Sequence, residues 1–283
     1  MMDLNDAEQI LKQAGQQADE DIDLLAVAGA FALFDLGKLD EPVPLDPYER
    51  HLDDMAAAIR RALPDGSGST DLTTHLEALK AVVVEAEGYR GDDQNYDALH
   101  NANILSVIER RRGLPVAIGL ICMALADRLG WDLKGLNFPG HFLLRLTVGK
   151  EQAIIDPFDG LSERQPGDLR LLIKAHRGPE ADFSPEHEQP VSRRDVLLRL
   201  RNNVKIRLLD ADDEEGALSC VEQMAWLKPQ DPDLRREVAM INIRLSKLRG
   251  AIDALEAVAL VEEDEIASRE AANMARELRR KLN

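Results

Sequence analysis

Two residues on neighbouring apolar runs have the types and spacing of a catalytic pair. His141 lies near the start of the run in "FPGHFLLRL" (residues 138–146), and Asp156 follows the run in "AIIDPFDG" (residues 153–160). An aspartate beside a histidine fixes the imidazole tautomer and stabilises the protonated ring, as a general base requires. The pair is therefore two thirds of a catalytic triad, and the third member to find is a nucleophile.

A hairpin is needed to bring His141 and Asp156 together. If residues 149–150 form a two-residue turn, counting back along both strands places Asp156 opposite Leu143. His141 then shares the face of Leu143, because side chains alternate between faces, and it is a diagonal neighbour of Asp156. A three-residue turn would separate the two side chains. An ordinary hydrogen bond between strands is the simpler explanation of the same spacing.

A cysteine nucleophile typically sits at the first turn of a helix, where the helix dipole favours the thiolate. A helix is expected to begin at Pro115, a favoured first helical residue, and to end at Gly130. Its first turn, "PVAIG", has no nucleophilic side chain. Cys122 lies two turns further on, at core spacing, and is expected to be a small buried apolar residue. The nucleophile is therefore absent from the expected place.

Four residues before this helix are candidates for ligand binding. Tyr96 and Asn101 bracket a polar loop and could line a cleft, although packing is the safer explanation. Arg111 and Arg112 belong to "ERRR" (residues 109–112), and arginine pairs can clamp a carboxylate or phosphate. The favoured alternative is that this basic run compensates a helix dipole and forms ion pairs. The other histidines lack metal-ligand spacing, so neither a metal nor a cofactor is expected.

Composition limits the class of partner. The chain has 283 residues and a formal net charge of -17, which argues against a nucleic-acid partner and against anionic membrane surfaces. The start of the chain lacks the pattern of a signal peptide, and the longest apolar run is too short to span a membrane. With two cysteines, no disulfide framework is needed, which indicates a cytoplasmic location. The sequence does not predict the oligomeric state.

Hydrophobic periodicity predicts helices before the candidate site and strands within it. Helices are expected over residues 19–37, with Gly37 as the C-cap, then over residues 48–63, 71–88 and 103–110. A flexible loop is expected at residues 64–70. Strands are expected over residues 132–138, 141–148 and 151–158. The stretch from residue 176 to residue 192 has the composition of a linker.

The remainder of the chain is helical and carries an internal repeat. "EGALSCVEQMAWLKP" and "RGAIDALEAVALVEE" align with Gly216 matched to Gly250, an offset of 34 residues. That offset is the period of tetratricopeptide helix pairs, and Ala217 and Ala251 occupy the position where paired helices approach closely. Such repeats usually bind other protein segments, but this one could equally be a scaffold packed on the first domain.

The segments "NANILSVIERRRGLPVAIGLICMALADRLG" (residues 101–130), "FPGHFLLRL" and "IIDPFDG", followed by the repeat, closely resemble the SirB family of bacterial transglutaminase-like proteins. This resemblance implies a papain-like core, with His141 as base and Asp156 as its orienter. The cysteine position would fall near Val116 or Ala117, and the family generally lacks that cysteine. Ala102 departs from the family, in which a serine is common.

Together these observations predict an α+β fold. A transglutaminase-like core with added N-terminal helices occupies residues 1–185, and an all-α tetratricopeptide-like region occupies residues 186–283. The predicted function is non-catalytic, that of a scaffold that binds a protein or peptide partner. The alternative is a hydrolase or acyl-transfer enzyme in which His141 and Asp156 act with water or with an atypical nucleophile.

Overall fold

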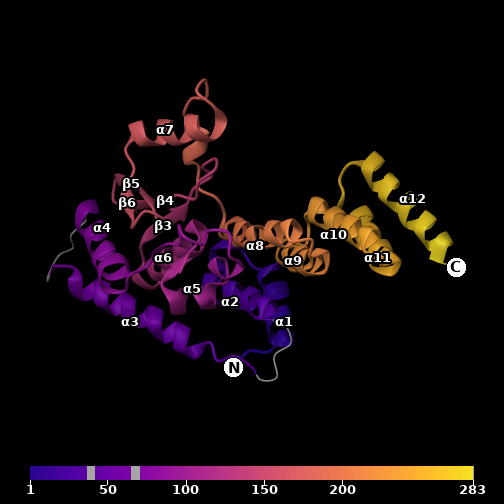
Figure 1. The fold of residues 1–283 in the computed structure, drawn as a ribbon, viewed down its shortest axis with the longest axis horizontal. Helices are drawn as coiled ribbons and strands as arrows, with labels where there is room; N and C mark the ends of the chain where they lie inside the picture. The colour runs from indigo at the N-terminus through magenta and orange to yellow at the C-terminus, as the bar shows by residue number, and fades with distance from the viewer. Residues whose placement is uncertain (37–41, 65–70, 283) are drawn as a thin grey trace. The chain divides into compact units, whose positions relative to one another are not determined.

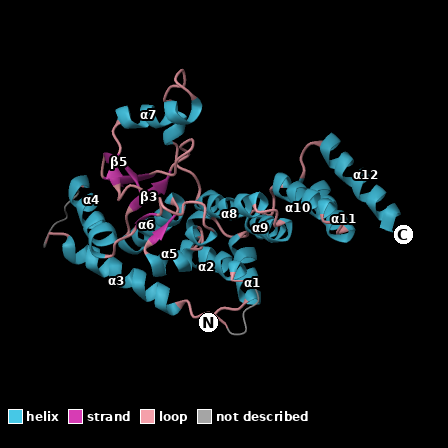
Figure 2. Ribbon diagram, in the orientation of Figure 1, coloured by secondary structure: helices cyan, strands magenta, loops and turns pink. Residues whose placement is uncertain are grey.

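The computed structural model describes residues 1–36, 42–64 and 71–282. Its internal contacts divide the chain into two compact units. Figure 1 colours the chain by residue number, from indigo at the N-terminus to yellow at the C-terminus. The first unit comprises Met1–Ala7 and Ala18–Leu197, and the second comprises Glu8–Gln17 and Leu198–Asn283. The first unit is α+β and the second is helical, so the predicted fold class is confirmed (Figure 2).

The first unit surrounds one central helix with shorter helices. The central helix is α6 (Pro115–Leu129), and α2, α3 and α5 pack against it. The unit also contains α4, a π-helical turn and α7. The bounds of all these elements are α2 (Leu24–Asp35), α3 (Asp46–Ala62), α4 (Leu72–Lys80), the π-helical turn (Ala81–Ala86), α5 (Ile104–Arg110) and α7 (Pro166–Arg177).

A four-stranded antiparallel sheet follows α6 in the chain. Its strands lie in sequence order: β3 (Asp132–Gly135), β4 (Leu144–Val148), β5 (Glu151–Asp156) and β6 (Ser162–Glu163). Val148 pairs with Glu151 and Leu144 pairs with Ile155, so the hairpin has the predicted two-residue turn and register. A short parallel pair, β1 (Arg90–Gly91) with β2 (Arg112–Gly113), lies before α6.

The sheet lies between α6 and α7 (Figure 1). On the α6 side, Gly119 leaves room for the ring of Phe142, which would lie 2.3 Å from a Cβ at this position. On the α7 side, a buried apolar cluster joins the sheet to that helix, with members Leu136, Phe138, Leu143, Leu169 and Ile173. The face towards α6 is buried along β3, β4 and β5, whereas the residues of the opposite face, apart from Asp156, are exposed or half-buried. The β4–β5 hairpin holds its register because a slip of one residue would move the apolar side chains to the more exposed face.

Helix α6 begins and ends where the sequence predicts. Pro115 is its first residue, where the missing N–H costs no hydrogen bond. Gly130 follows the last residue with φ 70°, a left-handed conformation that glycine adopts without strain. These two signals at its ends explain why the sequence predicts this helix well.

Two other predicted elements begin later than expected. Helix α2 begins at Leu24 because the carboxylate of Asp23 accepts hydrogen bonds from the N–H groups of Leu25 and Ala26. Strand β4 begins at Leu144, so His141 precedes the strand, and strand alternation does not fix the direction of its side chain. The predicted C-cap at Gly37 and most of the predicted loop at residues 64–70 lie outside the described residues.

The second unit consists of helices related by the predicted repeat. Gly216 and Gly250 each occupy the third position of their helices, α9 (Glu214–Leu227) and α11 (Leu248–Val261). The residues that follow them, Ala217 and Ala251, have no exposed surface, as expected where paired helices approach closely. The other elements are α10 (Pro232–Arg244), α12 (Glu265–Leu282), the latter part of α8 (Arg193–Asp210) and most of α1 (Leu4–Ala14).

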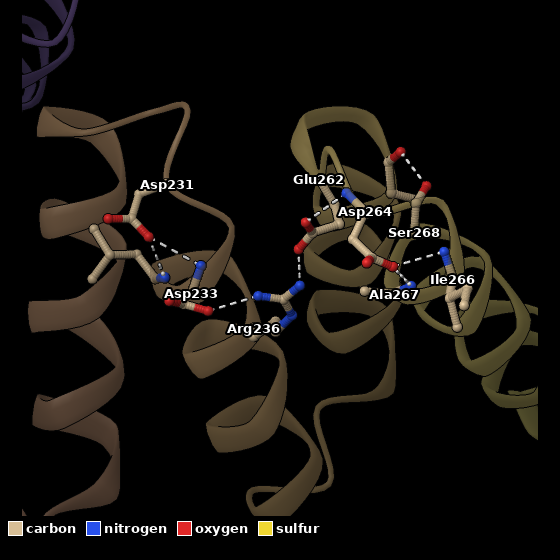
Figure 3. Close-up of polar contacts among 10 residues, drawn as sticks. Asp231, Asp233, Arg236, Glu262, Asp264, Ile266, Ala267 and Ser268 are labelled. Atoms are coloured by element: carbon tan, nitrogen blue, oxygen red, sulfur yellow. Dashed lines mark hydrogen bonds and ion pairs between the residues drawn. The ribbon is translucent and has the colours of Figure 1, made fainter.

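Arg236 links successive elements of the repeat region (Figure 3). Its guanidinium donates to Asp233 near the start of α10 and to Glu262 at the end of α11. Asp264 then caps α12 by accepting from the N–H groups of Ile266 and Ala267. One arginine and one helix cap therefore set the turn from α11 into α12.

Across the described part of the chain, we find no helix with the length and apolar character needed to cross a bilayer.

Candidate functional site

His141 follows a tight Pro-Gly turn. Gly140 has φ 73°, and a Cβ at this position would lie 2.4 Å from the ring nitrogen Nδ1 of His176 on α7. Glycine adopts this left-handed conformation without strain, and a Cβ there would displace the His176 ring, which explains the residue that precedes His141. The His141 imidazole is half-buried and lies edge-on to the ring of Phe138, with ring centroids 6.3 Å apart.

Asp156 is buried and its carboxylate bonds to two parts of the following turn. Oδ2 accepts from Nη2 of Arg164 at 2.8 Å and from Nε at 3.3 Å. Oδ1 accepts from the backbone N–H groups of Phe158 and Asp159, at 3.0 and 3.4 Å. Asp156 therefore ends β5 and organises its turn. Its catalytic pairing with His141 stays a prediction.

Arg164 was not predicted as a site residue, although the sequence carries a signal for it. Asp156 pairs with Ser162 in the register of β5 and β6, and the N–H of Arg164 donates to the carbonyl of Ile154. Arg164 lies two residues after Ser162, and side chains two residues apart point to the same face, so Arg164 lies on the face of Asp156. The sequence signal for this ion pair is an aspartate followed by a Pro-containing turn, with an arginine eight residues after the aspartate.

The first turn of α6 presents only buried apolar side chains. Val116, Ala117 and Ile118 are each at most 2% exposed. Cys122 has no exposed surface, and burial raises the pKa of its thiol to about 12. The prediction that Cys122 is a buried apolar residue is confirmed. A thiol in this state is protonated near neutral pH and is a poor nucleophile.

Asn101 is fully buried, and its amide bonds within the protein. Nδ2 donates to the carbonyl of Asn95 at 2.7 Å, and Oδ1 accepts from Nη1 of Arg110 at 2.9 Å. Arg110 also pairs with Asp92, and this bond holds the pKa of the Asp92 carboxyl below its ordinary value. The backbone carbonyl of Asn101 accepts from the N–H of Leu114, directly before α6. Asn101 therefore fixes the loop to the start of the central helix.

The basic run at residues 109–112 forms several of the contacts that the favoured interpretation predicts. Glu109 accepts from the hydroxyl of Tyr48 at 2.6 Å, and Nη2 of Arg111 lies 3.1 Å from Glu87. Arg111 adopts a left-handed conformation, φ 59°, at the C-cap of α5. Arg112 lies in β2, and the described residues offer it no ion-pair partner.

Tyr96 is 44% exposed, whereas Asn101 is fully buried. Its ring meets the ring of Phe158 edge-on, with centroids 5.7 Å apart. The loop that carries Tyr96 therefore packs against the turn that Asp156 organises.

A buried cluster around Tyr89 was not predicted from the sequence. Tyr89 is 1% exposed, and its hydroxyl lies 3.0 Å from Nε2 of His51 on α3. The guanidinium of Arg111 stacks 5.0 Å from the Tyr89 ring centroid and also pairs with Glu87, which lies 3.8 Å from His51. Burial, and then the charge of Arg111, lower the pKa of His51 below its ordinary value. The cluster joins residues that are far apart in sequence, so no local pattern signals it.

A search of the described residues finds no group of three or more histidine, cysteine, aspartate or glutamate side chains placed to hold a metal ion.

Residues 46–202 match the transglutaminase-like superfamily, and residues 204–280 match the tetratricopeptide repeat. A UPF0162 protein of Xylella fastidiosa (strain Temecula1) is 30% identical over 184 residues, which cover 64% of this chain and 66% of that protein. A UPF0162 protein of Vibrio cholerae is 32% identical over 163 residues, covering 57% and 60%. The chain thus spans less than two thirds of the length of these relatives.

Among solved structures, menin is similar over 92% of this chain and 70% of its own, with 10% identity and a TM-score of 0.43. The superfamily match covers more than half of the chain and contains α6, the sheet, His141 and Asp156. The chain therefore belongs to the transglutaminase-like superfamily, and a tetratricopeptide-repeat region follows its superfamily domain.

Proposed function

We propose that this protein is a non-catalytic member of its superfamily that binds a protein or peptide partner. The observation that carries the proposal is the first turn of α6, where a transglutaminase-like enzyme would present its cysteine. Here that turn holds Val116 and Ala117, both buried and both without a nucleophilic atom. Acyl transfer through a covalent enzyme intermediate needs such an atom.

The remaining chemistry around the turn supports the same proposal. Cys122 is the one cysteine on α6, and its thiol is buried and protonated near neutral pH. Asp156 uses one carboxylate oxygen to bind Arg164 and the other to bind two backbone N–H groups. Water activation by His141 would have to proceed with an aspartate that is already bonded to an arginine.

The repeat region supplies the binding half of the proposal. Tetratricopeptide repeats commonly mediate contacts between proteins, and their stacked helices present continuous surfaces for this purpose. The proposal also includes membership of the SirB family and a cytoplasmic location. It further includes a protein or peptide partner and excludes nucleic acid and membranes as partners. These assignments rest on the motifs, the two cysteines and the net charge of -17.

A comparison of His141→Ala with the unchanged protein tests the proposal. Each would be incubated with a glutamine-containing peptide and a fluorescent primary amine, and separately with an activated ester. We expect equal, background rates for both proteins, because the cleft lacks a nucleophile. A turnover that His141→Ala abolishes would overturn the non-catalytic assignment and favour a hydrolase or acyl-transfer enzyme. An Arg177→Ala variant, on the exposed end of α7, is the matched control.

A further inference from the structure

The second unit contains a groove of about 790 Å³ between its helices. One face each of α9, α10 and α11 lines it, together with the end of α1, and all of its lining residues belong to this unit. Helices α9 and α11 are the equivalent helices of the repeat. They occupy the same place in successive repeats, and each contributes a charged residue to the lining.

Half of the residues that line the groove are small or apolar. Gly250, Ala254 and Ala257 form a stripe along α11, while Trp226 on α9 supplies an aromatic surface. The stripe extends over about two helical turns, or roughly 10 Å. Small side chains allow the backbone of an incoming helix to approach closely, and an aromatic ring is a common anchor for it.

One buried polar side chain in the groove, Asn242, has an oxygen that can accept a further hydrogen bond. Asn242 is 3% exposed and donates from Nδ2 to the carbonyl of Val238 at 2.9 Å. Its Oδ1 lies 2.4 Å from the position of a Cβ on Gly250, so it points towards the α11 side of the groove. Within the described part of the chain, no group donates a hydrogen bond to this oxygen. It is an available acceptor beside the small residues of α11.

The charges of the groove select a cationic occupant. Glu222 on α9 and Asp253 on α11 both line the groove, and no described residue forms an ion pair with either carboxylate. The two lining cations are already engaged. Lys12 pairs with Glu8 and stands 5.3 Å from the Trp226 ring centroid, and Arg235 donates twice to the carbonyl of Pro229. Glu8 balances the charge of Lys12, whereas Arg235 keeps its charge because its partner is a neutral carbonyl. The two carboxylates and Arg235 therefore leave the groove with one excess negative charge.

We infer that this groove docks a basic amphipathic helix of a partner protein. The helix would place its apolar face on the small-residue stripe and its lysine or arginine side chains against Glu222 and Asp253. A helix fits better than an extended peptide, because the groove walls are helix faces whose backbone groups are already bonded and cannot extend a sheet. The inference rests on the proposed binding function and names the site and the kind of partner.

Fluorescence anisotropy with the 283-residue chain tests the inference. The probe is a labelled peptide of about four helical turns, with leucine and alanine on one face and lysine along its flanks. A matched peptide carries glutamate in place of lysine. We expect the lysine peptide to bind and the glutamate peptide not to bind. Equal binding of both peptides, or binding of neither, would overturn the inference.

Variants locate the binding. Glu222→Lys combined with Asp253→Lys should weaken the lysine peptide by about tenfold or more, since two attractive charges become repulsive. Ala257→Trp should also weaken it by filling the groove without changing its charge. Glu270→Lys, on the exposed side of α12, changes charge elsewhere and should leave the affinity within about twofold. Circular dichroism checks that each variant remains folded.

Two other outcomes separate this inference from the proposed function. If the lysine peptide binds unchanged to the charge-reversed and Ala257→Trp variants, the groove is not its site, while a non-catalytic binding role stands. If the peptide induces self-association of the protein in sedimentation rather than a one-to-one complex, the assignment to a partner helix is overturned. Neither outcome alters the rates that test for catalysis.

Discussion

Nη2 of Arg164 lies 2.8 Å from Oδ2 of Asp156, the residue expected to orient a catalytic histidine. The Asp156 side chain is 9% exposed and the Arg164 side chain is 23% exposed, so the pair is largely shielded from water. This carboxylate has a structural role, because it closes the turn from β5 into β6. An ion pair therefore stabilises the end of β5.

Replacing Arg164 should therefore destabilise the first unit. Arg164→Gln leaves a nearly buried carboxylate without its cation, at a cost of about 1–3 kcal/mol. Urea titration followed by Trp131 fluorescence, in a Trp226→Phe background, measures this loss. Arg177→Gln, which removes an exposed arginine from α7, is the control and should unfold with the unchanged protein. An unchanged midpoint for Arg164→Gln would contradict a structural role for the pair.

The close packing of α6 on the sheet makes a second prediction. Gly119→Ala places a methyl group 2.3 Å from Cε1 of Phe142, a ring that is 2% exposed and has little room to move. We expect a net loss of about 1–3 kcal/mol, because this overlap outweighs the gain of about 1 kcal/mol in helix propensity.

Gly167→Ala is the control for this substitution. Gly167 lies in the first turn of α7, and a Cβ there meets no atom within 4 Å. This variant should be neutral or slightly stabilised in the same urea titration. A Gly119→Ala protein as stable as Gly167→Ala would show that α6 does not approach the sheet as closely as described.

The His51–Tyr89 contact predicts a pH dependence of stability. Burial and Arg111 lower the pKa of folded His51 below its ordinary value of 6.5, with Glu87 and Asp54 opposing them. The unfolded chain therefore binds more protons between these two pKa values, and stability falls as pH drops below about 6.5. The His51→Gln variant keeps a side chain that can hydrogen-bond to Tyr89. Its free energy of unfolding should lack this part of the pH dependence.

Urea midpoints between pH 5 and pH 7.5 measure the effect. The exposed His100, changed to glutamine, is the control and should keep the pH profile of the unchanged protein. If the His51→Gln and His100→Gln profiles coincide, the buried His51–Tyr89 pair does not contribute.

Local signals account for the parts of the fold that the sequence predicted. Pro115 and Gly130 mark the ends of α6, the Gly149-Lys150 turn sets the hairpin register, and Gly216 and Gly250 reveal the repeat. Each depends on residues close in sequence or on a fixed period. The buried state of Cys122 also followed from the spacing of apolar residues along one helix.

Contacts between residues distant in sequence account for what the sequence did not predict. His51 reaches Tyr89 across 38 residues, and α1 joins the repeat helices from the far end of the chain. Gly15, for example, leaves space for the carbonyl of Trp226, which would lie 2.2 Å from a Cβ there. The partners of Asn101 could not be predicted for a similar reason, because its amide bonds to Asn95 and Arg110 only after the loop has folded onto α5.

The measurement closest to the central claim is the alkylation of Cys122 by iodoacetamide, located by peptide mass spectrometry at pH 7 and pH 9. A thiol with no exposed surface and a pKa near 12 should resist labelling in the folded protein at both pH values. In urea, both Cys122 and Cys220 should be labelled readily, which shows that the reagent is competent. Rapid labelling of Cys122 in the folded protein, rising with pH through the neutral range, would contradict the account and restore a nucleophile to the cleft.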